Sequence, residues 1–220
     1  MDLFSSYDVG GCFDEMFATP GAVRPPYSVL YERLLELTAA ELRQRQQDAD
    51  NAFLNQGVTF TVYGDDRGTE RIFPYDLVPR IITGSEWTTI ERGLIQRLTA
   101  LNHFLKDVYQ DGRILREGII PTELVYSAQH YRREMRGIRP RRDVYVSVAG
   151  TDLVRLPDGQ FAVLEDNLRV PSGVSYMLTN RQIIQRVFPE LFTNYVVRPV
   201  DHYGQVLACL LYTSPSPRDS

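Results

Sequence analysis

The residues best suited to chemistry lie where an apolar segment, Phe161–Leu164, ends in Glu165-Asp166-Asn167. Glu165 and Asn167 are two positions apart, so on an extended strand their side chains point to the same side. A carboxylate and an amide oxygen on one side are the hard oxygen ligands that a cation such as Mg²⁺ binds. The pattern therefore predicts a magnesium site, and with it phosphate chemistry.

A second carboxylate is predicted to lie next to this pair. Asp152 belongs to an apolar segment, Val144–Arg155, that favours a strand, and Leu156–Gln160 is typical of a hairpin turn. The two strands then pair antiparallel, with Asp152 almost opposite Glu165. Asp152, Glu165 and Asn167 converge as oxygen ligands, and nucleotide phosphates and water complete the magnesium shell. The alternative is a hairpin that simply ends in polar residues, with Asn167 starting a turn.

Two features that follow the strand suit an anion. Arg169 is permanently charged and can pair with a phosphate or a carboxylate. Ser172 and Gly173 stand at the start of a predicted helix that runs to Val187, where the first backbone N–H groups form a natural anion site. We therefore predict that Arg169, Ser172 and Gly173 contact the nucleotide.

A basic cluster precedes the hairpin and is a weaker candidate for binding a substrate carboxylate or phosphate. Its members are His130, Arg132, Arg133 and Arg136. The alternative interpretation is a solvated basic loop. His103 and Lys106, the only lysine of the chain, lie on a long predicted helix and are interpreted as structural and solvated, respectively.

The rest of the sequence predicts an α/β (α+β) protein in which helices and strands mix. Thr38 and Glu41 have the spacing of a capping box, and Ser85 is predicted to cap a long amphipathic helix. The predicted helices are 27–37, 38–55, 85–108 and 173–187, and the predicted strands are 59–63, 70–73, 124–126, 144–155, 161–165 and 195–200. Gly64–Gly68 is predicted to be a further hairpin turn.

The composition excludes several classes of protein. Hydrophobic residues make up 43% and charged residues 24%, which is typical of a globular protein. The net charge of -4 argues against a general nucleic-acid surface. We expect no membrane partner, since no apolar run is long enough to span a bilayer and the start lacks the features of a signal peptide. Cys12 and Cys209 have neither metal-site nor disulfide spacing, which favours a reducing cytoplasmic setting.

The last residues, 209–220, change sharply in composition. They resemble the translation of a transposase sequencing adaptor, and the alternative is a natural Ser/Pro-rich tail. If the adaptor interpretation holds, Cys209 is not native and the natural chain continues beyond Ala208.

The strand with an aspartate, the short hairpin and the strand ending in Glu-x-Asn resemble the magnesium-binding half of ATP-grasp enzymes. From about Tyr7 to Val200, the chain is similar to the circularly permuted ATP-grasp type 2 proteins, which are often labelled glutathionylspermidine synthases. The segments that carry the resemblance are residues 22–25, 53–57, 61–64, 70–74, 133–137 and 164–173.

The resemblance implies that Asp152, Glu165 and Asn167 hold Mg²⁺ between nucleotide phosphates and that Arg169 faces a phosphate. It implies an ATP-dependent carboxylate–amine ligase that forms an acyl phosphate, acting on small-molecule or peptide carboxylates and amines. The alternative is a non-catalytic binding or scaffold protein with the same fold.

We expect the chain to divide into an irregular arm (1–26), a helical and mixed domain (27–126), a third segment (127–208) and the tail (209–220). The resemblance implies that 127–208 is the magnesium-binding half of an ATP-grasp domain. In the permuted order, the lysine-bearing half that grips the nucleotide follows the magnesium-binding half. We therefore expect that the chain with the first half alone does not turn over ATP.

Overall fold

A computed structural model describes residue 4 and residues 6–61 and 70–213. The chain forms two compact units, each built from discontinuous stretches. The first unit comprises Met1–Thr83, Arg155–Ala162 and Ser172–Tyr203, and the second comprises Gly84–Val154, Val163–Pro171 and Gly204–Ser220. The linear division after residues 26, 126 and 208 stays a prediction, and the predicted turn at Gly64–Gly68 lies outside the described residues.

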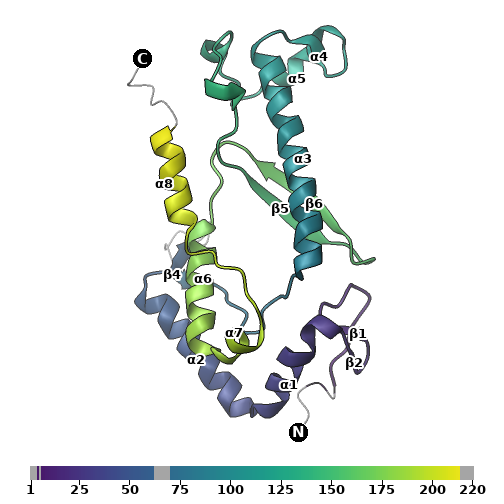
Figure 1. The fold of residues 1–220 in the computed structure, drawn as a ribbon, viewed down its shortest axis with the longest axis vertical. Coiled ribbons are helices and arrows are strands. Elements are labelled where there is room, and N and C mark those ends of the chain that lie inside the picture. The colour runs from purple at the N-terminus through teal and green to yellow at the C-terminus, as the bar shows by residue number, and fades with distance from the viewer. Residues whose placement is uncertain (1–3, 5, 62–69, 214–220) are drawn as a thin grey trace. The chain divides into compact units, whose positions relative to one another are not determined.

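The first unit combines helices with two short antiparallel strand pairs (Figure 1). Its elements are β1 (Phe17–Thr19), β2 (Ala22–Val23), the 3₁₀ turn η1 (Pro25–Tyr27), α1 (Ser28–Glu36), α2 (Ala39–Asn55), β3 (Thr59–Thr61), β4 (Glu70–Ile72), α6 (Val174–Val187) and α7 (Glu190–Asn194). The capping box is confirmed, because Thr38 Oγ1 accepts from Glu41 N at 3.2 Å and Thr38 N donates to Glu41 Oε2 at 2.7 Å.

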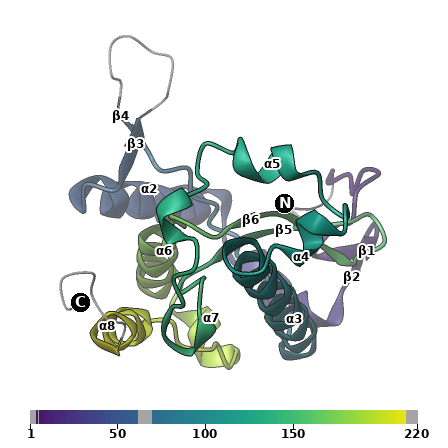
Figure 2. The ribbon, with the colours of Figure 1, turned by 90° about the horizontal axis from the view of Figure 1, so that it is seen from above.

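The hydrophobic core of this unit lies where α2 and α6 pack side by side (Figure 2). Phe53 from α2 and Ile183 from α6 are fully buried, and Ala49 provides a small contact residue between larger side chains. The N-terminal segment joins the same core through the buried Phe17. Burial of these apolar faces supplies the main stabilisation of the unit.

A charged contact also links α2 to α7. Arg45 donates to both carboxylate oxygens of Glu190, at 3.2 and 2.9 Å, and to the Val187 carbonyl at 3.0 Å. Its guanidinium lies 4.6 Å from the centre of the Phe188 ring. The hydrogen bonds from Arg45 lower the pKa of the Glu190 carboxyl below its usual value.

We expect Glu190→Gln to reduce the acid sensitivity of folding. Because the folded-state pKa of Glu190 is depressed, its contribution to stability is present above the unfolded pKa of about 4.3 and is lost as the pH falls through the folded value. Both partners are partly exposed, so the loss at pH 7 should stay under about 1 kcal/mol. Urea unfolding between pH 7 and 3 measures it, with the exposed Glu32→Gln as a charge-matched control. Parallel pH profiles for wild type and Glu190→Gln would contradict this role.

The second unit is built around the long helix α3 (Gly84–Tyr109). The other helical elements that lie wholly within it are α4 (Arg113–Arg116), α5 (Thr122–Tyr126), and the 3₁₀ turns η2 (Arg133–Met135) and η3 (Arg141–Asp143). Strands β5 (Gly150–Arg155) and β6 (Phe161–Asn167) form a two-stranded sheet, and the parts of these strands in this unit lie beside α3 (Figure 1). Helix α8 spans Tyr203–Thr213. None of the helices in the described ranges combines the length and apolarity needed to cross a bilayer.

Three predicted strand segments were wrong. Residues 124–126 belong to α5, because Pro121 and Glu123 accept backbone hydrogen bonds within a helical turn. Residues 144–149 are not a strand, because the amides of Tyr145 and Val146 donate to the Asn102 side chain on α3. Residues 195–200 form no strand. In that segment, the Tyr195 hydroxyl bonds instead to the start of α1.

The start of the long helix also differs from the prediction. Helix α3 begins at Gly84, so Ser85 lies in its first turn and does not precede it. The predicted helices at 27–37, 38–55 and 173–187 are confirmed within one or two residues at each end.

Candidate metal and phosphate site

The turn of the β5–β6 hairpin is fixed by backbone geometry. Leu156 N donates to Gln160 O at 2.8 Å, and Gly159 N donates to Leu156 O at 2.9 Å. Gly159 has φ +83°, and a Cβ there would lie 2.7 Å from the Phe13 ring, so this position requires glycine. The predicted turn is therefore confirmed, and a connection this short makes the two strands antiparallel.

Asp166 has a structural role. Its carboxylate accepts from Arg97 Nε at 2.6 Å and from Thr151 Oγ1 at 2.9 Å, and its side chain is only 9% exposed. Arg97 lies on α3 and Thr151 lies on β5, so Asp166 attaches the hairpin to the helix. Sequence reasoning assigned Asp166 no role, since its partner Arg97 is 69 positions away.

The direction of Asp166 decides the direction of its neighbours. Side chains alternate along a strand, so Glu165 and Asn167 point to the face opposite Asp166. Thr151 shares the Asp166 face, and Asp152 therefore shares the other one. All three predicted ligands are exposed. One step along both antiparallel strands from the Thr151–Asp166 contact brings Asp152 beside Glu165.

The ligand chemistry of this face fits Mg²⁺. Asn167 Nδ2 donates to Glu165 Oε1 at 2.8 Å, which holds the two side chains together and leaves the Asn167 amide oxygen available. The described residues contain no group of three or more His, Cys, Asp and Glu side chains that could hold a metal ion by themselves. Two carboxylates and one amide suit a cation that also takes phosphate oxygens and water. Metal binding by Asp152, Glu165 and Asn167 stays a prediction.

Sequence reasoning missed Gly150, which allows the segment after β6 to lie close to the start of β5. A Cβ at Gly150 would lie 2.9 Å from Pro171 Cβ and 3.9 Å from Asn167 Cβ. Glycine at the start of β5 therefore permits the close approach of Pro171. A glycine inside a predicted strand, here 144–155, is the signal that could have indicated such an approach.

Two candidate anion-binding residues meet in the second unit. Arg169 Nη1 lies 3.2 Å from His130 Nδ1, although 39 positions separate them, and both residues are exposed. Two other members of the basic cluster, Arg132 and Arg136, contact tyrosines. Arg136 lies 5.7 Å from the centre of the Tyr126 ring, and Arg132 N donates to the Tyr109 hydroxyl at 3.2 Å.

Ser172 and Gly173 belong to the first unit. Gly173 has φ +93° and is the N-cap of α6, with no side-chain cap. Backbone N–H groups at this helix start therefore lack a side-chain acceptor at the cap, as an anion site needs. Contact of Ser172 and Gly173 with a nucleotide stays a prediction.

The sequence matches one family over most of its length. Residues 79–220 match the family described as circularly permuted ATP-grasp type 2. The chain belongs to this family. This match supports the interpretation of the Glu165-x-Asn167 hairpin as ATP-grasp sequence and confirms the predicted family. Together with the mixed helices and strands, it confirms the predicted fold class.

Relatives of this ATP-grasp chain are longer proteins. An uncharacterized protein of Synechocystis sp. is 46% identical over 211 residues, which cover 96% of this chain and 44% of the relative. An uncharacterized protein of Mycobacterium leprae is 48% identical, over 99% of this chain and 39% of the relative. A Frankia casuarinae protein named "Putative glutamate--cysteine ligase 2-2" is 41% identical, over 86% of this chain and 22% of the relative. The chain thus spans less than half the length of these relatives.

We expect Asp166→Asn to destabilise the second unit by about 1–2 kcal/mol, because it removes the charge that pairs with Arg97 while keeping an acceptor for Thr151. Urea unfolding measures this loss. Asp201→Asn removes an equally charged but exposed carboxylate and serves as the control. Equal stabilities of the Asp166→Asn and Asp201→Asn variants would show that the contact with α3 contributes nothing.

Proposed function

We propose that this chain supplies the magnesium-binding part of an ATP-dependent carboxylate–amine ligase. The observation that carries the proposal is the separation of roles on the hairpin: Asp166 faces α3, while Asp152, Glu165 and Asn167 share the opposite, exposed face. Membership of the ATP-grasp family supports ligase chemistry, and the name of the Frankia relative supports an acid and an amine as substrates.

In this proposal, Asp152 and Glu165 bind the metal through carboxylates and Asn167 through its amide oxygen. Bound Mg²⁺ supplies neutralisation of the charge that develops on the transferred phosphoryl group. Asn167 orients Glu165 through their 2.8 Å hydrogen bond, and Asp166 keeps the strand in position by its contacts with Arg97 and Thr151.

Arg169 contributes a permanent positive charge that suits a nucleotide phosphate or an acyl phosphate. His130 lies within hydrogen-bond distance of its guanidinium and, as a neutral imidazole that accepts from Nη1, orients it. Small-molecule or peptide carboxylates and amines are the proposed substrates. A cytoplasmic setting is part of the proposal and is supported by Cys12, which is exposed and forms no disulfide.

The metal site is testable without catalysis. Mn²⁺ replaces Mg²⁺ at oxygen sites and broadens the NMR signals of nearby nuclei. Titration of the ¹⁵N-labelled chain should broaden the amides of residues 151–153 and 164–168 first, and Glu165→Gln should shift this effect to higher Mn²⁺ concentration by about tenfold or more. Asp158→Asn removes a carboxylate from the turn of the same hairpin and is the matched control.

Broadening that is unchanged in Glu165→Gln, or that begins at acidic residues elsewhere, would refute the metal assignment. Asn167→Ala tests the amide ligand separately. It should weaken Mn²⁺ binding without removing a charge, so a result equal to wild type would exclude Asn167 from the coordination shell.

A further inference from the structure

A pocket of about 530 Å³ lies in the second unit between α3 and the segment from Arg142 to Ala149. This volume suits a small organic molecule. Its polar lining includes Asn102, His103, Lys106, Arg142, Asp143 and Ser147. Leu98, Val144 and Val146 form part of its apolar lining. None of these residues takes part in the proposed metal and phosphate site.

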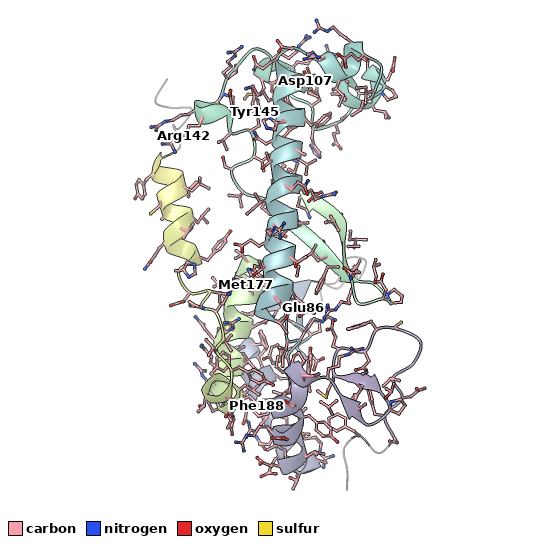
Figure 3. The ribbon with its side chains drawn as sticks, turned by 45° about the vertical axis from the view of Figure 1, so that its right-hand side comes forward. Glu86, Asp107, Arg142, Tyr145, Met177 and Phe188 are labelled. Carbon is pink, nitrogen blue, oxygen red and sulfur yellow. The ribbon has the colours of Figure 1, made fainter. Side chains whose placement is uncertain are left out.

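The backbone beside this pocket is held in an unusual conformation. Arg142 and Asp143 are consecutive residues with φ of 58° and 56°, and they are the only positive-φ residues other than glycine in the described part of the chain. Non-glycine residues rarely adopt this region, and such strain concentrates at binding sites. Figure 3 labels Arg142 and, close by on the same segment, Tyr145.

Hydrogen bonds from side chains of α3 stabilise the backbone conformation of this segment. Asn102 Nδ2 donates to the Asp143 carbonyl at 2.9 Å, while Asn102 Oδ1 accepts from Tyr145 N at 2.7 Å. Lys106 Nζ donates to Asp143 Oδ2 at 2.6 Å. This hydrogen bond holds the pKa of the Asp143 carboxyl below its usual value, with smaller contributions from the nearby charges of Arg139 and His103. The chain therefore positions this wall of the pocket through several contacts.

Positive side chains outnumber carboxylates in the lining of the pocket. Lys106 is balanced by Asp143, whereas Arg142 adds a positive charge and His103 adds a polar imidazole, with no second carboxylate in the lining. We propose that this pocket binds a small organic anion, with a carboxylate or phosphate group at the Lys106, His103 and Arg142 side and an apolar body against Leu98 and Val146. The proposal does not depend on the ligase function.

NMR titration of the ¹⁵N-labelled chain tests the proposal with benzoate and phenyl phosphate as probes and benzamide as the neutral isostere. We expect saturable shifts of amides in residues 99–106 and 142–147 with at least one anion, and binding of benzamide about tenfold weaker or more. The anion that binds more tightly distinguishes a carboxylate ligand from a phosphate ligand. Equal binding of benzamide, or shifts outside these residues, would overturn the proposal.

Variants of the pocket residues test which side chains contribute to binding of the anion. Arg142→Asn removes the charge but keeps a residue that tolerates a left-handed backbone, and His103→Gln keeps a similar size and polarity. Each should weaken binding of the anion several-fold to about tenfold. Arg116→Gln removes an exposed charge elsewhere in the second unit and should leave binding unchanged. Wild-type affinity in both pocket variants, or the same loss in Arg116→Gln, would contradict an anion site at this pocket.

Discussion

Glu165→Gln, placed in a longer protein that contains this chain, should lower the proposed ATP-dependent ligation by about 100-fold or more. Glutamine keeps the size of the side chain and still accepts the hydrogen bond from Asn167 Nδ2, but it removes the negative charge that is proposed to hold the metal. With weaker metal binding, the charge on the transferred phosphoryl group is less well neutralised. The measurement is phosphate release in the presence of both substrates as Mg²⁺ is varied.

The Mg²⁺ dependence distinguishes this effect from general damage. A lost ligand raises the Mg²⁺ concentration needed for half-maximal rate, whereas a misfolded protein loses rate at every concentration. Adding Asp152→Asn to Glu165→Gln should lower the rate far less than the product of the single effects, since both carboxylates act on the same ion in the proposed site. Asp158→Asn should keep the wild-type rate. A Glu165→Gln variant with wild-type rate and Mg²⁺ dependence would exclude the proposed role.

Local sequence signals were sufficient wherever the contacts that fix an element are also local. Thr38 and Glu41 are three positions apart, and the capping box that they form begins α2 as expected. The turn at Leu156–Gln160 is likewise closed by hydrogen bonds within five residues. The spacing of Glu165 and Asn167 correctly predicts that their side chains lie together on one face of the strand, because alternation along a strand depends on backbone geometry alone.

Distant contacts decided the features that sequence reasoning missed. Residues 144–149 have the apolar character of a strand, yet Asn102 on α3 takes the hydrogen bonds that a neighbouring strand would otherwise make. The roles of Asp166 and His130 depend on Arg97 and Arg169, which lie 69 and 39 positions away. Periodicity carries no information on such pairs. The same limit applies to His103 and Lys106, which line a pocket only because residues 142–147 lie against α3.

Phe53→Ala should destabilise the first unit by about 3–5 kcal/mol, because it removes a buried ring and leaves a cavity that its neighbours fill only in part. Phe53 is fully buried, and its ring centre lies 5.1 Å from that of Tyr75 and 6.0 Å from that of Phe73. Burial raises the pKa of the Tyr75 hydroxyl to about 12, as expected for a region that excludes water. Urea unfolding followed by circular dichroism measures the loss.

Leu54→Ala is the matched control, since Leu54 is the next residue of α2 but is 56% exposed. Its effect should stay within about 0.5 kcal/mol of wild type. If Phe53→Ala does not fold at all, Phe53→Leu leaves a smaller cavity and should retain a measurable transition. Equal losses in the Phe53 and Leu54 variants would show that burial of Phe53 contributes nothing to the stability of this unit. A large loss confined to Phe53 would instead establish the core around this ring as one on which the unit depends.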